Sequence, residues 1–412
     1  MTSSPTPSEP AWRKLFPRAS AAEWSDWRWQ MRNAVRSTEA LEKLIPLTSE
    51  ERAGCRDTAG LFRLGITPYY LSLIDPDHPF CPIRMQAIPV RSEAHARGWE
   101  LVDPLGEDDH RPVAAIVHKY PDRVLLLALD SCPVYCRHCT RRRITKGGEV
   151  ELGREELRQA IDYIRSHPEV RDVLISGGDP LLLSDARMEE LLVPIAEIKH
   201  VEMIRIGTRI PVCLPMRVTE ELAKLLRRFA PLYVITHFNH PKEITHEART
   251  ACELLVDHGV PVENQAVLMR RVNSSARIIR ELSHACLKMR VRPYYLHQMD
   301  LAEGLEHFRT PISNGIEILE SLRGHTTGLA VPHLAIDLPG GGGKVTIQPN
   351  YVIERRSDQT LFRSYRGETY SYPEPEETDC TCPYDETWCA RGGPSPDGAR
   401  HVNGDPPAAR AR

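Results

Sequence analysis

The chain has 412 residues, 41% of them hydrophobic, and its 53 basic and 56 acidic residues give a formal net charge of −3. It is long enough to bury a sizeable core in about two to three domains, and its balanced charge gives no reason to expect nucleic acid as a partner. No apolar stretch approaches the roughly 20 residues of a membrane span, the first ten residues lack the pattern of a signal peptide, and eleven scattered cysteines fit a reducing cytoplasm.

The first 112 residues predict a helical region followed by a connector. From Ala11 to about Leu64 the chain carries helix formers with apolar residues three and four positions apart, the period of an amphipathic helix. Among them, Trp24, Trp27 and Trp29 could form an interaction surface, although aromatic residues at this spacing more often belong to a core. From Thr67 to Pro112 the chain is rich in proline, which predicts loops with short helices.

The most informative motif follows an apolar run, Arg123 to Asp130, that predicts one buried strand. Next come Cys132, Cys136 and Cys139, in a loop at the C-terminal end of that strand, where α/β barrels carry their active sites. A 4Fe–4S cluster normally binds four thiolates, so three closely spaced ones leave one iron free for a small molecule. Radical S-adenosylmethionine (SAM) enzymes have this arrangement. Zinc sites usually have paired Cys-x2-Cys motifs, and no second pair lies nearby.

Beyond this loop, apolar runs and amphipathic stretches alternate about every 30 residues. The predicted strands are Val124–Leu129, Val173–Ser176, Met203–Gly207, Tyr233–His237, Gln265–Leu268 and Tyr294–Gln298. The predicted helices are Glu155–His167, Met188–Ile198, Glu220–Arg228, Thr245–His258 and Ser275–Lys288. Alternation of this kind predicts parallel strands with right-handed crossovers, and hence an α/β fold with a partial (β/α)6 TIM-like barrel over residues 113–348. A further β segment is expected at Leu329–Leu338 and Lys344–Ile347.

Gly177 and Gly178 directly follow the predicted strand that ends at Ser176. Without side chains they would let the backbone approach a ligand closely, with N–H groups free to bind a carboxylate or an amino group. Gly-Gly-Asp-Pro is also an ordinary turn, and the motif alone does not separate the two interpretations. Its position one strand after the cysteines fits a loop that holds the amino group of SAM.

A ribbon of four glycines precedes Lys344 near the end of the predicted barrel. The segment is not a P-loop, because that motif requires Gly where Leu338 stands and Ser or Thr where Val345 stands. A lysine beside residues without side chains suits a Schiff base with pyridoxal phosphate (PLP), since the planar ring needs room. The alternative is a flexible glycine hairpin with an exposed lysine, which the motif by itself favours.

Two aspartates and an arginine lie near predicted strand ends, on the same rim as the cysteines. Asp300 follows one strand, and Asp337 ends a β segment just before the glycine ribbon. A pair of carboxylates there would hold a cation, although a single aspartate at such a position often caps the next helix or turn. Arg141 begins a run of three arginines after the last of the three cysteines. Such a run is usually solvated, but a buried arginine could clamp a substrate carboxylate bidentately.

Together these features resemble the lysine 2,3-aminomutase family, from about Trp24 to Cys382. The segments that carry the resemblance are Trp27-Arg-Trp-Gln, Tyr120-Pro-Asp-Arg, Tyr135-Cys-Arg-His-Cys-Thr-Arg-Arg-Arg, His237-Phe-Asn-His-Pro, Arg292-Pro-Tyr-Tyr, Gly304-Leu-Glu-His-Phe-Arg-Thr-Pro and Pro339-Gly-Gly-Gly-Gly-Lys. The resemblance implies an isomerase with a radical SAM barrel and three cofactors, which are a 4Fe–4S cluster, SAM and PLP.

The resemblance also implies roles for individual residues. The cluster would be ligated by Cys132, Cys136 and Cys139. PLP would be bound by Lys344, with its phosphate near Tyr120, Arg123 and Lys119, the last at a position where the family usually has arginine. SAM would be contacted by Ser176, Gly177, Gly178, His237 and Gln265. The substrate would be bound through its α-carboxylate by Arg141 and through the cation of its side chain by Asp300 and Asp337.

The implied reaction moves the α-amino group of L-lysine to the β-carbon and gives β-lysine, by way of a 5′-deoxyadenosyl radical made from SAM. Two carboxylates would repel the side chain of glutamate, and related enzymes that act on glutamate replace them, so Asp300 and Asp337 favour a cationic substrate. Arginine, with β-arginine of secondary metabolism as the product, is the alternative, because a guanidinium also pairs with carboxylates.

The chain departs from the family pattern at two places. Family members carry a zinc site built from Cys-x-Cys-x2-Cys and a cysteine of a neighbouring subunit. Here Cys380 and Cys382 match, but position 385 is Asp and the next cysteine is Cys389, so zinc bound by these three cysteines would have altered ligation, and the family's usual site is not expected. Position 297 is His where the family typically has Tyr near the cofactor, a change that could reflect a different substrate.

The partners expected from the resemblance are an amino acid substrate, an electron donor of the flavodoxin or ferredoxin type and further copies of the chain in a homo-oligomer, without nucleic acid or membrane. A branch of the superfamily that modifies a lysine of translation elongation factor P is shorter and lacks the residues after Ile347, which argues against that function.

Residues 349–390 are predicted to form a C-terminal extension. Residues 391–412, rich in Gly, Pro, Asp and Arg, are predicted to be a disordered tail.

Overall fold

A computed structural model describes residues 11–145 and 151–377 of the chain. It divides the chain into two compact units, Met1–Pro349 and Asn350–Arg412. Within the described residues, no helix is long and apolar enough to cross a membrane. The cysteines at positions 380, 382 and 389, and the tail predicted for residues 391–412, lie outside the described residues.

The region before the sheet consists of short helices joined by loops, as predicted. These helices are α1 (Ala11–Leu15), α2 (Ala21–Ser25), α3 (Trp27–Arg32), α4 (Thr38–Glu42), α5 (Ser49–Asp57), α6 (Pro68–Ser72) and α7 (Pro82–Ala87). A capping box starts α5, where the Thr48 side chain accepts the backbone N–H of Glu51 and the Glu51 carboxylate accepts that of Thr48. Trp24 is buried and stacks on Trp12 with 4.5 Å between ring centroids, so it belongs to a core.

Unit Met1–Pro349 is built on a sheet whose strands neighbour one another in sequence order. The strands are β1 (Ile116–Tyr120), β2 (Arg123–Leu129), β3 (Asp172–Gly177), β4 (Met203–Gly207), β5 (Leu232–Thr236), β6 (Val262–Leu268), β7 (Arg292–Gln298), β8 (His333–Leu338) and β9 (Gly343–Ile347). Strands β2 to β8 are parallel, while β1 and β9 pair antiparallel at the two edges. The six predicted barrel strands are confirmed, and β8 extends their parallel array. The further β segment begins later than predicted, because residues Gly328–Ala330 form a 3₁₀ turn.

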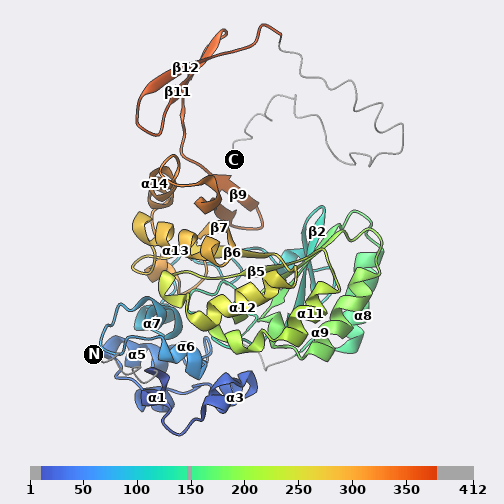
Figure 1. Cartoon of the computed structure of the whole chain (residues 1–412), viewed down its shortest axis with the longest axis vertical. Helices are drawn as coiled ribbons and strands as arrows, with labels where there is room; N and C mark the ends of the chain where they lie inside the picture. Colours follow the sequence, from blue (N-terminus) through green and yellow to red (C-terminus); the bar gives the residue numbers. More distant parts are fainter. Residues whose placement is uncertain (1–10, 146–150, 378–412) are drawn as a thin grey trace, which may run out of the picture. The chain divides into compact units, whose positions relative to one another are not determined.

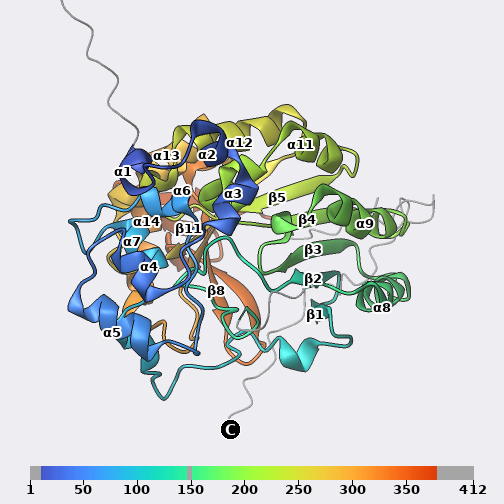
Figure 2. The same cartoon turned by 90° about the horizontal axis from the view of Figure 1, so that it is seen from below.

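Helices connect the parallel strands and lie along the outer side of the curved sheet (Figures 1 and 2). They include α8 (Arg154–Arg165), α9 (Asp185–Ala196), α11 (Glu220–Arg227), α12 (His246–Asp257), α13 (Ala276–Lys288) and α14 (Ile312–Leu322). Helix α11 shows why they pack in this way, since Leu222, Leu225 and Leu226 are buried on one face while Glu220 and Lys224 form an ion pair on the exposed one. The five predicted helices are therefore confirmed, with each end within three residues of its predicted position.

The two edges of the sheet meet through side chains and a glycine contact. The hydroxyl of Tyr120 on β1 accepts the backbone N–H of Lys344 on β9 at 2.9 Å. Gly106, in the segment before β1, approaches the glycine ribbon so closely that a Cβ there would lie 2.8 Å from the nitrogen of Gly341. Gly106 also has a φ of +64°, which glycine adopts without strain. We call this junction between β1 and β9 the seam.

Unit Asn350–Arg412 contains, in its described part, a small antiparallel sheet. Its strands are β10 (Val352–Arg355), β11 (Gln359–Arg363) and β12 (Thr369–Pro373), paired in that order. The strands are short and mostly exposed, and Thr360 on β11 is the residue of this sheet that is buried. Tyr370 and Tyr372 on β12 are exposed.

Candidate active site

The three predicted cluster cysteines lie in one loop that leaves the C-terminal end of β2. All three are free thiols, and the backbone N–H of Cys139 donates to the carbonyl of Cys136 at 2.9 Å, which makes the loop a tight turn. Burial raises the pKa of Cys132, and it raises the pKa of Cys139 to about 11. Among the described residues, no three His, Cys, Asp or Glu side chains converge on a point where one ion would bind. A cubane cluster instead offers each thiolate its own iron, so this donor set fits a 4Fe–4S cluster.

The backbone of the Gly177-Gly178 motif packs directly against the residues that lead into this loop. The N–H of Gly178 donates to the carbonyl of Leu129, and the N–H of Asp179 donates to the carbonyl of Ser131 at 2.8 Å. A Cβ on Gly177 would lie 2.4 Å from the oxygen of Leu129, and one on Gly178 would lie 2.3 Å from that of Ser131. The expectation that both N–H groups are free for a ligand is therefore wrong for Gly178. The glycines are needed because the backbone before Cys132 passes directly over them.

We expect Gly178→Ala to displace the cysteine loop, because the new methyl group overlaps a backbone carbonyl that cannot move alone. The variant should lose about 1–3 kcal/mol of stability and bind several-fold less iron after anaerobic reconstitution. Thermal unfolding and iron content per chain measure both effects. Gly98→Ala is the matched control, since a Cβ there meets nothing within 4 Å. Wild-type iron content and stability in Gly178→Ala would show that the contact is unimportant.

Of the residues predicted to contact SAM, His237 lies beside the cysteine loop. It follows β5, and its ring centroid is 5.3 Å from that of His138, which stands between two of the cysteines. Burial and the nearby charge of Arg209 lower the pKa of His237 to about 3, so its ring is neutral. Its Nε2 is buried without a hydrogen-bond partner among the described residues, which fits a position that faces a bound ligand. Gln265 lies on β6, paired with Tyr295 of β7, and Ser176 lies on β3.

Lys344 is the centre of a second group of polar residues, at the seam. Its ammonium lies 2.5 Å from Oδ2 of Asp337 on β8 and 3.2 Å from Nδ1 of His297 on β7, and 5.5 Å above the ring of Tyr295. Burial and the charge of Lys344 lower the pKa of His297 well below its usual value, so this histidine is neutral. The lysine is thus held at a fixed position by β7 and β8, and the exposed hairpin weighed as an alternative is not what the structure contains.

The residues predicted to surround the PLP phosphate lie on the β1–β2 hairpin. The guanidinium of Arg123 lies 3.9 Å from the centroid of the Tyr120 ring, whose hydroxyl bonds to Lys344. Lys119 donates to the carbonyl of Leu105 at 2.9 Å and lies 6.0 Å from the same ring. Two cations and a phenol therefore gather next to the lysine. This donor set fits an anionic cofactor that Lys344 would bind covalently.

Asp337 lies close enough to Asp300 to act on its pKa. Burial and the charge of Asp337 raise the pKa of Asp300 to about 7, while Lys344, Arg141 and Lys119 act in the opposite direction. All four of these groups consequently lie near Asp300, although they come from different strands and loops. The structure places Asp300 just after β7 and Asp337 near the end of β8, and the raised pKa marks Asp300 as a carboxylate that lacks sufficient cationic compensation.

Arg141 is partly buried and ion-paired. Its guanidinium donates to the buried carboxylate of Glu107 at 2.8 Å, and Glu107 belongs to the connector before β1. Burial acts to lower the pKa of Arg141, but Glu107 reverses the effect and the pKa is raised. The next two arginines are also ion-paired, Arg142 with Glu93 and Arg143 with acidic residues that include Asp108. The solvated charge run weighed from the sequence is therefore wrong.

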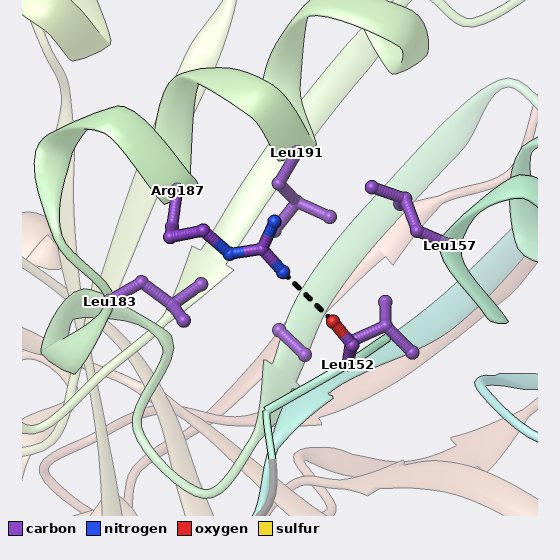
Figure 3. A pocket seen from close by; sticks show the side chains of 6 residues that line it. Leu152, Leu157, Leu183, Arg187 and Leu191 are labelled. Atoms are coloured by element: carbon purple, nitrogen blue, oxygen red, sulfur yellow. Dashed lines mark hydrogen bonds between the residues drawn. The ribbon is translucent and has the colours of Figure 1, made fainter. Parts of the chain in front are cut away.

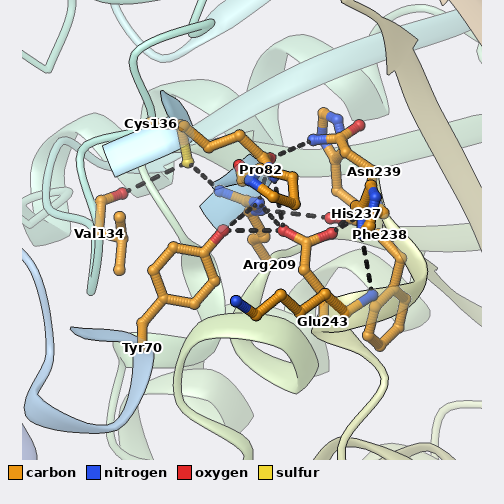
Figure 4. Close-up of polar contacts among 12 residues, drawn as sticks. Tyr70, Pro82, Val134, Cys136, Arg209, His237, Phe238, Asn239 and Glu243 are labelled. Atoms are coloured by element: carbon orange, nitrogen blue, oxygen red, sulfur yellow. Dashed lines mark hydrogen bonds and ion pairs between the residues drawn. The ribbon is translucent and has the colours of Figure 1, made fainter. Parts of the chain in front are cut away.

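Two further residues escaped the sequence analysis. Arg209, two residues after β4, donates to the sulfur of Cys136 and pairs with buried Glu243 (Figure 4). Arg209 lies close to a predicted strand end, but Glu243 lies in a 3₁₀ turn seven residues after β5, and no sequence spacing links the two. A small pocket on another part of the unit is lined by Ala128, Leu152, Leu157, Leu183, Arg187 and Leu191 (Figure 3). It contains none of the predicted site residues, so it does not define the site.

A barrel of parallel strands with three free cysteines in the loop after its first parallel strand defines a radical SAM enzyme, and residues 127–280 match the radical SAM superfamily. Residues 319–394 match the lysine-2,3-aminomutase family. The chain is 52% identical to L-lysine 2,3-aminomutase of Clostridium subterminale, over 90% of this chain and 89% of that one. It is 49% identical to the L-lysine 2,3-aminomutase of Bacillus subtilis, over 88% and 77% of the two chains. The chain belongs to the lysine 2,3-aminomutase family.

A third relative acts on a different substrate. Glutamate 2,3-aminomutase of Clostridioides difficile is 39% identical to the chain, over 87% of this chain and 84% of that one. The higher identity to the lysine enzymes agrees with the cationic substrate expected from the two aspartates. The alternative substrate, arginine, gains no support from these relatives.

Proposed function

We propose that the protein is a lysine 2,3-aminomutase, which moves the α-amino group of L-lysine to the β-carbon while one hydrogen passes from the β-carbon to the α-carbon, giving β-lysine. The observation that carries the proposal is the pair Asp300 and Asp337 beside Lys344, at the rim of a radical SAM barrel. Both acids face a lysine that is the candidate for covalent attachment of PLP. A substrate bound there would meet two carboxylates at the far end of its side chain.

The cofactors of the family have candidate ligands in the described residues. Cys132, Cys136 and Cys139 would hold the 4Fe–4S cluster, and Lys344 would bind PLP. The residues that would line the remaining cofactor surfaces are Tyr120, Arg123 and Lys119 for PLP, and Ser176, Gly177, Gly178, His237 and Gln265 for SAM. When bound, the cluster and SAM supply a carbon radical and PLP supplies an electron-accepting ring for the amino group. The protein has to orient the reactants and exclude water.

The side chains of this chain would fix the substrate at both ends. Asp300 and Asp337 would bind the ε-ammonium, and Arg141 would bind the α-carboxylate. Arg141 is preoriented by the buried Glu107, which holds its guanidinium at 2.8 Å and leaves part of the guanidinium open to a second anion. An aminomutase for glutamate would place a third carboxylate against Asp300 and Asp337, at a cost of several kcal/mol.

The proposal also extends to partners. The cluster would need an electron donor of the flavodoxin or ferredoxin type and a reducing compartment, for which we propose the cytoplasm. The protein would be a homo-oligomer. Cys380, Cys382 and Cys389 would ligate a zinc ion only with a ligand set different from that of the family.

The test is anaerobic reconstitution of the full chain with iron and sulfide, followed by addition of SAM, PLP and dithionite, with lysine, arginine and glutamate offered separately. We expect conversion of lysine to β-lysine and no turnover of glutamate. Chromatography of the derivatised amino acids measures both. Turnover of arginine alone would contradict the substrate assignment while leaving the mechanism in place. Turnover of none of the three, in a protein that holds both cluster and PLP, would contradict the proposed function.

A further inference from the structure

The side chain of Arg209 ends at the sulfur of one candidate cluster cysteine. Its Nη1 donates to Sγ of Cys136 at 2.8 Å, and its Nε donates to the carbonyl of His237 at 3.2 Å (Figure 4). The side chain is 8% exposed, so water does not screen this contact. An arginine cannot lose its proton in a protein, and the contact therefore places a permanent positive charge against the sulfur.

A buried polar network holds the guanidinium in this orientation. Its Nη2 donates to Oε1 of Glu243, to the hydroxyl of Tyr70 at 3.0 Å and to Oε1 of Gln86 at 2.7 Å. Glu243 is fully buried and also accepts the hydroxyl of Tyr70 at 2.8 Å and the amide of Gln86 at 3.1 Å. The backbone N–H of Arg209 donates to Oδ2 of Asp179, next to the glycines below the cysteine loop, at 2.7 Å. Every nitrogen of the guanidinium thus has a partner.

The network joins three parts of the chain that the sequence separates widely. Tyr70 lies on α6 and Gln86 on α7, both in the N-terminal helical region, whereas Glu243 follows β5. Glu243 binds Nη2 of the guanidinium, whereas Cys136 accepts from Nη1. The ion pair of Arg209 and Glu243 therefore presents its positively charged member to the sulfur. Such a buried pair is costly to assemble, and its hydrogen bonds are all satisfied, which gives it one defined geometry.

We propose that Arg209 is a positioning residue that raises the reduction potential of the cluster by donating a hydrogen bond to the Cys136 thiolate, an inference that rests on the proposed cluster ligands. Reduction adds one electron, and part of its charge resides on the cysteine sulfurs. A donor and a positive charge at one sulfur stabilise the reduced cluster more than the oxidised one, and hydrogen bonds to sulfur are one of the factors that set cluster potentials. The N-terminal helices thereby influence electron entry through Tyr70 and Gln86.

The experiment is a redox titration of the reconstituted full chain without SAM. Electron paramagnetic resonance measures the fraction of reduced cluster at each potential. In Arg209→Gln we expect the reduced fraction at a fixed solution potential to fall about tenfold, a shift of the midpoint by about 59 mV to more negative values. Arg209→Lys should restore part of the shift. The matched control is Arg217→Gln, which removes another buried arginine, one that pairs with Asp185 and donates to the carbonyl of Leu183 rather than to a cysteine.

Iron content per chain separates the outcomes. A wild-type chain that binds no cluster would overturn the proposed function itself. Arg209→Gln with wild-type iron and an unchanged midpoint would overturn this inference alone, and so would an unchanged midpoint with weakened SAM binding, which would assign Arg209 to the cosubstrate. If Arg209→Gln fails to fold, Tyr70→Phe keeps the arginine but removes one of its acceptors. A smaller shift in the same direction is then expected, and no shift would overturn the inference.

Discussion

We expect Lys344→Ala to lose aminomutase turnover by roughly 10³- to 10⁶-fold, the range seen when a group that acts covalently is removed. The reason is that Lys344 is the amine at the seam that lies within reach of Asp337 and His297 and can form a Schiff base. The variant should also lose the visible absorption of bound PLP and the PLP-labelled peptide that borohydride reduction gives in the wild type. These two readouts do not depend on catalysis.

Two controls separate the covalent role from the charge. Lys344→Arg keeps a cation against Asp337 but cannot form a Schiff base, so it should be as inactive as Lys344→Ala and more stable, because Asp337 is largely buried and would otherwise lose its ion pair. Lys224→Ala removes an exposed lysine on α11 and should change neither turnover nor PLP content. Wild-type rates in Lys344→Ala would refute the PLP assignment.

We expect Asp300→Asn to lower kcat/KM for lysine by about 10²- to 10³-fold, because in the proposed binding mode the ε-ammonium would lose one of its two carboxylates in a largely buried site. The pH dependence gives a second, independent readout. The pKa of Asp300 is raised to about 7 by burial and by Asp337, whereas that of an unfolded aspartate is about 3.9. Wild-type enzyme should therefore bind lysine more tightly as the pH rises through about 7, and the variant should lack this rise.

The raised pKa of Asp300 also affects how the free energy of unfolding depends on pH. The direction of this dependence is opposite to that produced by an ordinary ion-paired aspartate. Between pH 4 and pH 7 the folded enzyme holds the proton of Asp300 and the unfolded chain does not, so the free energy of unfolding of the cofactor-free enzyme falls as the pH rises. Asp300→Asn should therefore be more stable than wild type at pH 8, by about 1–3 kcal/mol, and the difference should vanish near pH 4. Asp77→Asn, at an exposed position, should show neither effect. Equal pH profiles for wild type and Asp300→Asn would contradict the assignment.

The regular helices and strands were predictable because each apolar periodic segment ends at residues that also break or cap an element. Helix α12 and strand β4 illustrate this, since each lies within two residues of its predicted range. The start of β8 was not, because Leu329 reads as an apolar strand residue while Gly328 and the preceding Thr327 form a capped turn. The local cap by Thr327 outweighs the apolar pattern there, and Leu329 is left exposed.

Candidate site residues could be proposed from local pattern, but their pairings could not. Cysteine spacing and the lysine after four glycines each mark candidate ligands in this way. The pairing of Arg141 with Glu107, by contrast, joins positions 34 residues apart, and that of Arg209 with Glu243 also spans 34. The backbone bonds of Gly178 depend on how closely β2 and β3 pack. Such contacts depend on the tertiary arrangement of loops, which no spacing in one sequence encodes.

The seam also sets the order in which the enzyme can be completed. Tyr120 and Lys344 are 224 residues apart, so their contact closes a long loop and costs more chain entropy than the pairing of neighbouring strands. A nascent chain on the ribosome lacks β9 until nearly all of the first unit has been synthesised. A vitamin-derived cofactor that binds Lys344 can therefore be captured only once β9 has been made, after every other strand of the barrel.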